Sequence, residues 1–536
     1  MGEFDYIIVG AGSAGCVLAE RLSADRSKRV LLLEAGGSDR RFRIRMPIGY
    51  GRTFHDPAVN WRYTTEPDPG LGGRAAYWPR GKVVGGSSSI NAMVYCRGLP
   101  GDYDDWRDAG NPGWGWTDVE PVFRSFERRI RRDGSQHGDG PLWVSDREPE
   151  YHPIKRHFYA AARELGLPVV DDLDGSAPEG GIGAYAVNTR KGLRCSAADA
   201  FLRPALARSN LVLAIHARVE RVAIRGCRAV GVDYVQGGRR RQATARGEVV
   251  LCAGAVNTPQ LLQLSGIGPG DLLQRLGIPV VHANAAVGGG LQDHLGISYF
   301  YRATEPTLNQ VLGTWPGRLA AGLRYLLTRS GPLSLGVNQL GGLVRTSPGA
   351  SRPNTQLYFN PVSYSIEHAG KRPLLKPDPY PGFIIGFNTC RPTSVGRIDI
   401  ASPEPERPPR ITPNYLSTDR DIEDVIASAR LIGRIQETEA MRALVADRPV
   451  FDPARASDEE ILADFRARSG SVFHACGTCR MAPESAGGVV DGELRVHGIR
   501  ALRVVDASVF PNITSANTHA PTLMVAHKAA RLIAAG

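Results

Sequence analysis

The opening of the chain, from Tyr6 to Glu34, constrains the fold more than any other segment. Residues 6–9 (Tyr-Ile-Ile-Val) form a continuous apolar run, which is typical of a parallel strand buried on both faces. A glycine-rich turn follows, Gly10-Ala11-Gly12-Ser13-Ala14-Gly15, and leads into a helix-like stretch that ends at Leu22. Arg29 to Leu33 is a second strand-like run. This order predicts the βαβ unit of a Rossmann-type α/β domain that binds a dinucleotide.

Each glycine of the turn has a physical role in that prediction. Gly10 permits the tight turn, Gly12 lets the backbone approach a pyrophosphate, and Gly15 lets helix and strand pack closely. The phosphates would then rest on the helix N-terminus, near Ser13 and Ala14. Glu34, followed by Ala35, ends the second strand and is expected to accept hydrogen bonds from ribose hydroxyls, which disfavours NADP. FAD and NAD both fit this pattern.

Composition narrows the class of protein. A chain of 536 residues is too long for one hydrophobic core, so at least two domains are expected. The formal net charge of +11 is spread along the chain without a nucleic-acid-binding module, which disfavours nucleic acid as a partner. Eight cysteines in so long a chain do not indicate a disulfide framework. With no apolar run long enough for a membrane span and no room for a signal peptide before the first strand, we expect a cytoplasmic protein.

Four longer segments of the sequence indicate which of these two cofactors, FAD or NAD, the glycine turn binds. The first runs from Arg80 through Gly85-Gly86-Ser87-Ser88-Ser89-Ile90-Asn91 to Tyr95, and the others are 254–268, 287–294 and 504–508 with 517–522. Together they resemble the signatures of the glucose-methanol-choline (GMC) oxidoreductases, and the likeness runs from Phe4 to about Ile533. The nearest members are bacterial choline-dehydrogenase-like enzymes and aryl- or furfuryl-alcohol oxidases.

The resemblance implies one FAD and a set of residues that contact it. Members with covalent FAD carry a His where this chain has Ile90, so the FAD is expected to be noncovalent. The N-terminal dipole of the last helix, near Pro521, would stabilise negative charge on the reduced flavin. The cofactor contacts implied, beyond the glycine turn, are Val83, Ser87, Asn91, Ala92, Met93, Val94, Val219, Phe473, Asp506, Ala507, Asn517 and Thr518.

The resemblance also implies a two-domain architecture. We expect a discontinuous FAD-binding domain at 1–155, 195–295 and 465–536, and a substrate-binding domain, built on an antiparallel sheet, at 156–194 and 296–464. Overall the fold class is α/β, or α+β when both domains are counted. The Gly/Pro/Trp-rich region from about Arg45 to Gly115 predicts irregular backbone that covers a site.

Two polar residues are the predicted catalytic pair. His474 stands where the family has its active-site His, and an imidazole suits removal of a hydroxyl proton. Asn517 falls on the second position, where an amide can hold the substrate oxygen but cannot take its proton. His519 lies two residues further on and is not expected to take that role. Cys476 and Cys479 lack a second ligand pair, so no metal site is predicted.

The sequence thus predicts FAD-dependent oxidation of a primary alcohol to an aldehyde, with hydride passing from the alcohol carbon to flavin N5 and His474 as general base. The electron acceptor is either oxygen or a quinone- or dye-like compound. Choline is disfavoured because Gly296 stands where choline oxidases carry an acid. Alternatives are a hydroxynitrile-lyase-like, non-oxidative flavoenzyme, an NAD-dependent Rossmann dehydrogenase and a basic nucleic-acid-binding protein.

Overall fold

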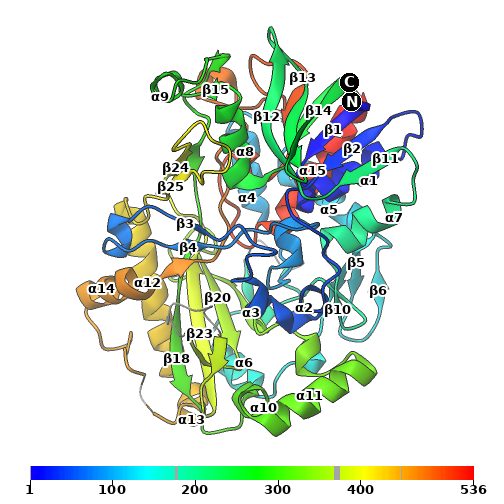
Figure 1. The fold of residues 1–536 in the computed structure, drawn as a ribbon. Helices are drawn as coiled ribbons and strands as arrows, with labels where there is room; N and C mark the ends of the chain where they lie inside the picture. The colour runs from blue at the N-terminus through cyan, green and yellow to red at the C-terminus, as the bar shows by residue number, and fades with distance from the viewer. Residues whose placement is uncertain (1, 175–178, 367–374, 448, 536) are drawn as a thin grey trace.

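A computed structural model describes residues 2–174, 179–366, 375–447 and 449–535. Two sheets organise the molecule, one at the upper right and one at the lower centre of Figure 1, with irregular chain between them. The two chain termini lie side by side at the upper right of Figure 1, at the outer end of the strands of the upper sheet. Among the described residues, none of the helices has the length and apolar character needed to cross a bilayer.

The upper sheet has a parallel part in the order β11-β2-β1-β14, and β27 pairs with β14. Ile8 lies between Leu32 and Val250, and all three side chains are buried. The end of β1, all of β2 and the end of β14 are continuous apolar runs because these stretches are buried in the interior. The bounds are β1 (Gly2–Val9), β2 (Val30–Leu33), β11 (Leu211–Ala214), β14 (Arg239–Leu251) and β27 (Leu502–Val504).

An antiparallel ribbon extends the same sheet through β12 (Ala217–Arg225) and β13 (Arg228–Gln236). The first half of β14 pairs antiparallel with β13, and its second half pairs parallel with β1. From Leu211 to Val235 the alternation of the sequence predicts two antiparallel strands. This prediction is wrong in number, because the segment contains β11 as well as the antiparallel pair β12 and β13. His216, at φ +52°, breaks the chain after β11, which joins the parallel part instead.

Two helices pack together against the parallel strands. They are α1 (Ser13–Leu22) and α15 (His519–Ala535). The last helix is buried on nearly every side over its first turns, as expected for a helix that is apolar all round. Its N-terminus and that of α1 both point toward the region between the two sheets (Figure 1).

The lower sheet is antiparallel throughout, in the order β26-β18-β23-β20-β19-β8. This confirms the predicted fold class. β26 belongs to a segment predicted for the FAD-binding domain, yet it pairs with β18 and leads directly to His474. The bounds are β8 (Gly181–Ala184), β18 (Leu295–Arg302), β19 (Leu340–Val344), β20 (Thr355–Asn360), β23 (Gly382–Thr389) and β26 (Gly470–Ser471). Helix α12 (Asp419–Gln436) packs against β23.

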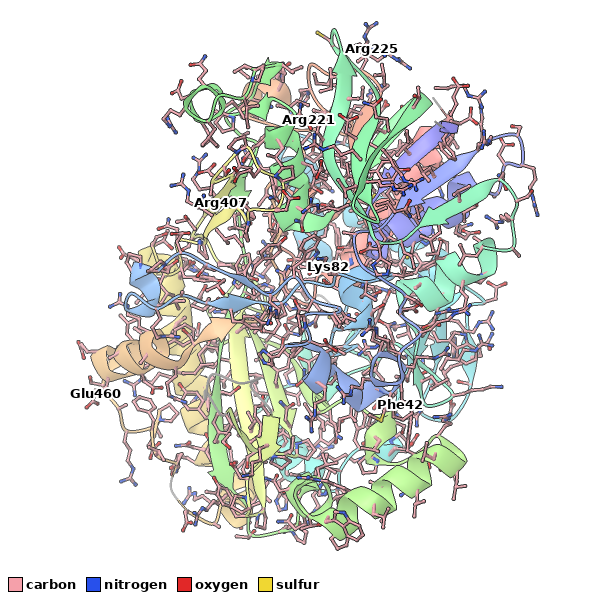
Figure 2. The ribbon with its side chains drawn as sticks, viewed as in Figure 1. Phe42, Lys82, Arg221, Arg225, Arg407 and Glu460 are labelled. Carbon is pink, nitrogen blue, oxygen red and sulfur yellow. The ribbon has the colours of Figure 1, made fainter. Side chains whose placement is uncertain are left out.

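The region from about Arg45 to Gly115 is mostly irregular, as its composition predicts; apart from α4 (Pro100–Asp108), its described elements span four residues or fewer. β3 (Tyr63–Thr64) and β4 (Tyr77–Trp78) form a two-stranded ribbon that crosses between the two sheets in Figure 1. Lys82, labelled in Figure 2, lies near the centre of the molecule on the chain that follows β4. This segment therefore covers the space where the two sheets meet.

Candidate active site

One cavity of about 1460 Å³ runs between the two sheets. This exceeds the ~300–1,000 Å³ of a usual ligand pocket, so it has room for a dinucleotide and a second small molecule. Gly15 and Val83, both predicted to contact the cofactor, do not line it. The predicted residues that do line it are Gly10, Gly12, Ser13, Ala14, Glu34, Ala35, Ser87, Asn91, Ala92, Met93, Val94, Val219, Phe473, His474, Asp506, Ala507, Asn517 and Thr518.

The glycine turn and the serine-rich signature meet directly. The Gly85 amide donates to the Ala11 carbonyl oxygen at 2.7 Å, and a Cβ on Gly86 would lie 2.7 Å from the Gly12 Cα. Gly86 also has φ +54°, which favours glycine. The two motifs are far apart in sequence but their backbones touch here. Any side chain at position 86 would collide with the backbone of Gly12, so this contact requires glycine at position 86.

The same turn leaves space on the cavity side. A Cβ on Gly12 would meet protein only at 3.8 Å, and no side chain caps α1 at Gly12. Free amides at a helix N-terminus bind phosphate. A Cβ on Gly15, by contrast, would lie 1.9 Å from the Gly10 carbonyl oxygen, so Gly15 serves helix packing. The turn therefore fits the pyrophosphate of FAD.

Glu34 ends β2 with both carboxylate oxygens engaged. One oxygen accepts from the Ala11 amide at 3.0 Å and the other from the Gly36 amide at 2.7 Å. Burial raises the pKa of Glu34 to about 7. Each oxygen keeps a further lone pair, and the residue lines the cavity, so Glu34 can bind the ribose while it holds the glycine turn.

We therefore expect Glu34→Ala to weaken FAD binding by about 1–3 kcal/mol, the cost of leaving buried donors unpaired. Titration of the apoprotein with FAD, followed by flavin fluorescence, measures this. Glu34→Gln keeps an acceptor oxygen and should bind FAD more tightly than Glu34→Ala. An alanine variant with the parent's affinity would show that Glu34 is not a ribose ligand.

Asp506 joins the second and fourth signatures. Its carboxylate accepts from the Gly254 amide at 2.8 Å and from the Thr258 hydroxyl at 2.6 Å, both at the start of α8 (Gly254–Leu264). It also accepts from the Ser508 amide at 2.8 Å. This buried carboxylate fixes the cavity wall that its neighbour Ala507 lines.

His474 lies buried in the wall of the cavity, in contact with a second histidine. Its Nδ1 is 2.9 Å from Nδ1 of His294. The other nitrogen of His294, Nε2, lies 2.8 Å from the Cys390 carbonyl oxygen. On the cavity side, Nε2 of His474 is 3.1 Å from the amide nitrogen of Asn517. The predicted pair, His474 and Asn517, is thus brought together.

These distances assign the proton positions. The Cys390 carbonyl can only accept, so His294 carries its proton on Nε2. Burial lowers the pKa of His294 to about 4, which leaves its Nδ1 as a lone pair at neutral pH. His474 must then donate from Nδ1. Its Nε2 is therefore the basic nitrogen, and that nitrogen faces Asn517.

Asn517 is oriented in turn by Gln356 of β20. The Gln356 amide donates to the Asn517 carbonyl oxygen at 3.3 Å and to the Tyr185 hydroxyl at 3.2 Å. This directs the Asn517 amide hydrogens to His474 and the cavity. His519 instead lies 3.2 Å from the Ser13 hydroxyl at the start of α1, and it has no contact with His474 among the described residues.

Asp293 and Arg80 fix the backbone around His474. Asp293 accepts from the His474 amide at 2.7 Å and from the hydroxyls of Ser471 and Tyr415. Arg80 donates to the carbonyl oxygen of Phe473 at 3.1 Å. Phe473 itself adopts φ +71°, a conformation that costs a non-glycine residue about 1–3 kcal/mol and clusters at functional sites.

Burial also keeps His474 neutral. It lowers the pKa of His474 well below 6.5, and the neighbouring His294 and Arg80 lower it further. The neutral imidazole is the form that can accept a proton. His474 is therefore a neutral imidazole at neutral pH and has the capacity to accept a proton.

The Cys-x-x-Cys segment is part of the packing around this site. Cys476 pairs through its main chain with Gln292 in both directions, and the Cys479 amide donates to the Ser508 carbonyl oxygen at 2.7 Å. Burial raises the pKa of both thiols well above 9. Across the described residues, no cluster of His, Cys, Asp or Glu is arranged to hold a metal ion.

The sequence did not identify His294, Asp293, Arg80 and Gln356 as functional residues. His294 and Asp293 stand side by side in the third signature, and this polar pair next to a strand of buried residues was the available signal. Gln356 sits in an apolar strand, where only its full burial reveals a hydrogen-bonding role.

Comparison with known proteins identifies the family. Models of the GMC oxidoreductase family match residues 4–296 and 392–526. An alcohol dehydrogenase [acceptor] of Pseudomonas putida is 43% identical over 99% of this chain and 95% of its own. The mitochondrial choline dehydrogenase of Mus musculus is 41% identical over 99% and 89%. Pyridoxine 4-oxidase from Mesorbium loti superposes with a TM-score of 0.87 at 31% identity, with 98% of both chains covered.

The chain belongs to the GMC oxidoreductase family. It is an FAD-dependent oxidoreductase that acts on CH–OH groups. This membership decides between FAD and NAD in favour of FAD, which the glycine turn by itself could not do.

Proposed function

We propose that the protein oxidises an uncharged primary alcohol to an aldehyde, with Nε2 of His474 taking the hydroxyl proton. The observation that carries this is the chain of hydrogen bonds from Cys390 through His294 to His474, which leaves the basic nitrogen facing the cavity. Bound FAD supplies the acceptor for the hydride that leaves the alcohol carbon. Because Ile90 replaces the linking histidine, the FAD is noncovalent.

Asn517 holds the alcohol oxygen in this proposal. Its amide has two hydrogens, so one can stay on His474 while the other binds the substrate oxygen. Gln356 keeps this amide from rotating. Loss of the hydroxyl proton to His474 raises the electron density on the alcohol oxygen, and that helps hydride to leave the carbon.

The pH dependence follows from the lowered pKa of His474. A base with a depressed pKa stays unprotonated, and so active, as the pH falls through 6.5. We expect the rate of flavin reduction by alcohol to hold its plateau from alkaline pH down through 6.5 and to fall only at a clearly lower pH. Anaerobic stopped-flow reduction across pH measures this. A loss of rate that starts above 6.5 would contradict the assignment of a neutral, buried base.

The charges of the cavity favour an uncharged substrate. Gly296 lines the cavity without offering a carboxylate, and the half-buried cation Arg80 donates to the carbonyl oxygen of the residue next to His474. Of the lining carboxylates, Glu34 and Asp506 are engaged by backbone amides and Glu406 pairs with Arg218. Asp293, which binds the His474 amide, does not line the cavity, so a quaternary ammonium would meet no free carboxylate on the described part of the cavity wall beside His474.

Dimethylbutanol, the uncharged isostere of choline, tests this substrate class. We expect its kcat/KM to exceed that of choline, because the two differ only in the cationic nitrogen. Higher kcat/KM for choline would contradict the uncharged-alcohol proposal. Peroxide and dye readouts run in parallel on the same samples then separate oxygen from a quinone-like acceptor.

A further inference from the structure

Helix α11 (Trp315–Thr328) exposes one apolar face. Ala321 and Tyr325 anchor the opposite face in the protein. Trp315 is 74% exposed and Leu327 is 81% exposed, values far from those of core residues. The exposed residues recur three or four positions apart, as one helical face requires; they are Trp315, Leu319, Leu323, Leu326 and Leu327.

A further exposed aromatic residue lies beside α11. The Phe42 ring, on α2 (Phe42–Arg45), lies with its centroid 6.3 Å from that of Tyr325 and is 55% exposed. Figure 2 labels Phe42 just above α11, at the lower right of the molecule. We call Phe42 and the five exposed residues of α11 the α11 patch.

The rim of the α11 patch is rich in arginine. No Asp or Glu occurs between Glu305 and Glu367 in the sequence. The exposed arginines of the rim form no ion pair with a carboxylate of the described residues; they are Arg40, Arg41, Arg43, Arg318, Arg324 and Arg329. Unpaired guanidinium groups around an apolar face complement an anionic surface.

The cavity reaches the same place. Arg318, which is exposed, lines the cavity together with Leu312 of α10 (Leu308–Gly313) and Leu333. His474 lines the same cavity. The cavity therefore opens at the edge of the α11 patch.

We propose that the α11 patch docks the protein on the surface of an anionic lipid bilayer. A helix with an apolar face and basic flanks lies in the plane of the bilayer interface, where Trp side chains are enriched. Each arginine near such a surface strengthens binding by about fivefold. Docking places the cavity mouth at the boundary of headgroups and acyl chains, so an apolar reactant enters from the bilayer.

Co-sedimentation of the FAD-loaded protein with vesicles tests the proposal. One set of vesicles is phosphatidylcholine alone, and the other has equal parts of phosphatidylcholine and phosphatidylglycerol. We expect the parent to bind the anionic vesicles at least about tenfold more tightly than the neutral ones. The double variant Leu326→Glu/Leu327→Glu should lower binding to anionic vesicles by about tenfold or more.

A matched control adds the same two charges elsewhere. Val281→Glu/Val395→Glu replaces apolar residues that are 40% and 47% exposed. They directly precede β16 (His282–Ala283) and β24 (Gly396–Asp399); β24 and β15 (Ile267–Gly268), the partner of β16, lie at the upper left of Figure 1, away from α11. This variant should bind like the parent. Both variants should keep the parent's rate on a water-soluble alcohol, which shows that fold and site are intact. If the α11 variant loses FAD, Trp315→Ala replaces it.

Three results would overturn the proposal: a parent that stays in the supernatant with both kinds of vesicle, equal binding to both kinds, or an α11 variant that binds as the control does. The first of these would point to a protein partner for the α11 patch. Sedimentation needs no turnover, so its outcome is independent of whether the proposed reaction is right.

Discussion

His474→Ala should lower the rate of flavin reduction by alcohol about 10²–10⁴-fold, the usual contribution of a general base. The physical reason is that Nε2 of His474 is the lone pair fixed toward the cavity by His294. FAD should stay bound, because the glycine turn and Glu34 lie elsewhere. Anaerobic stopped-flow reduction of the purified holoprotein measures the rate, and the visible spectrum reports the bound flavin.

Variants of two nearby residues serve as comparisons for His474→Ala. Asn517→Ala removes a hydrogen bond rather than the proton acceptor, so it should cost less than His474→Ala. His519→Ala is the matched histidine control: it contacts Ser13 and should affect FAD binding more than the reduction rate. Reduction of His474→Ala within a few-fold of the parent would end the base assignment, and an equal loss in His519→Ala would show that the second position was misassigned.

Gly86→Ala should lower FAD affinity about 10²-fold. Its Cβ would lie 2.7 Å from the Gly12 Cα, so backbone would have to move away from backbone at the phosphate site. Overpacking usually costs about 1–3 kcal/mol. Since both contacting groups are backbone and no flexible side chain can move away, we expect a loss of binding free energy at the upper end of this range. That loss corresponds to an FAD affinity about 10²-fold lower. Titration of the apoprotein with FAD measures the change.

Gly226→Ala is the control for the effect of the left-handed backbone conformation alone. Gly226 has φ +57°, close to the +54° of Gly86, but its Cβ would meet nothing within 4 Å. It lies in the turn between β12 and β13, far from Gly12. We expect this variant to bind FAD like the parent. Equal losses of affinity in both variants would attribute the effect to φ and refute the contact.

Much of the fold could be predicted from local patterns. Apolar runs such as Tyr6–Val9 and the glycine turn predict β1, α1 and β2 because parallel strands and tight turns leave clear signals. The segment 211–235 was harder, since its division depends on the left-handed turn at His216 and on pairing partners far away in sequence. Alternation alone does not show which strand a segment will join.

Only those residues of the active site that stand within a recognisable sequence motif could be predicted from the sequence. His474, Asn517 and Glu34 stand in recognisable segments, and the structure brings the first two together. The tautomer of His474 depends on His294 and on a main-chain carbonyl at Cys390. These three residues are joined by tertiary packing, so no local pattern reports their contact.

Anaerobic addition of a primary alcohol to the yellow holoprotein tests the central claim most directly. If His474 removes the hydroxyl proton while hydride leaves the carbon, the flavin bleaches, an aldehyde forms in equal amount, and deuterium on the alcohol carbon slows the bleaching. The lyase-like alternative moves only a proton, so its flavin stays oxidised while product appears. Turnover of any substrate with the flavin remaining yellow under nitrogen would contradict the account.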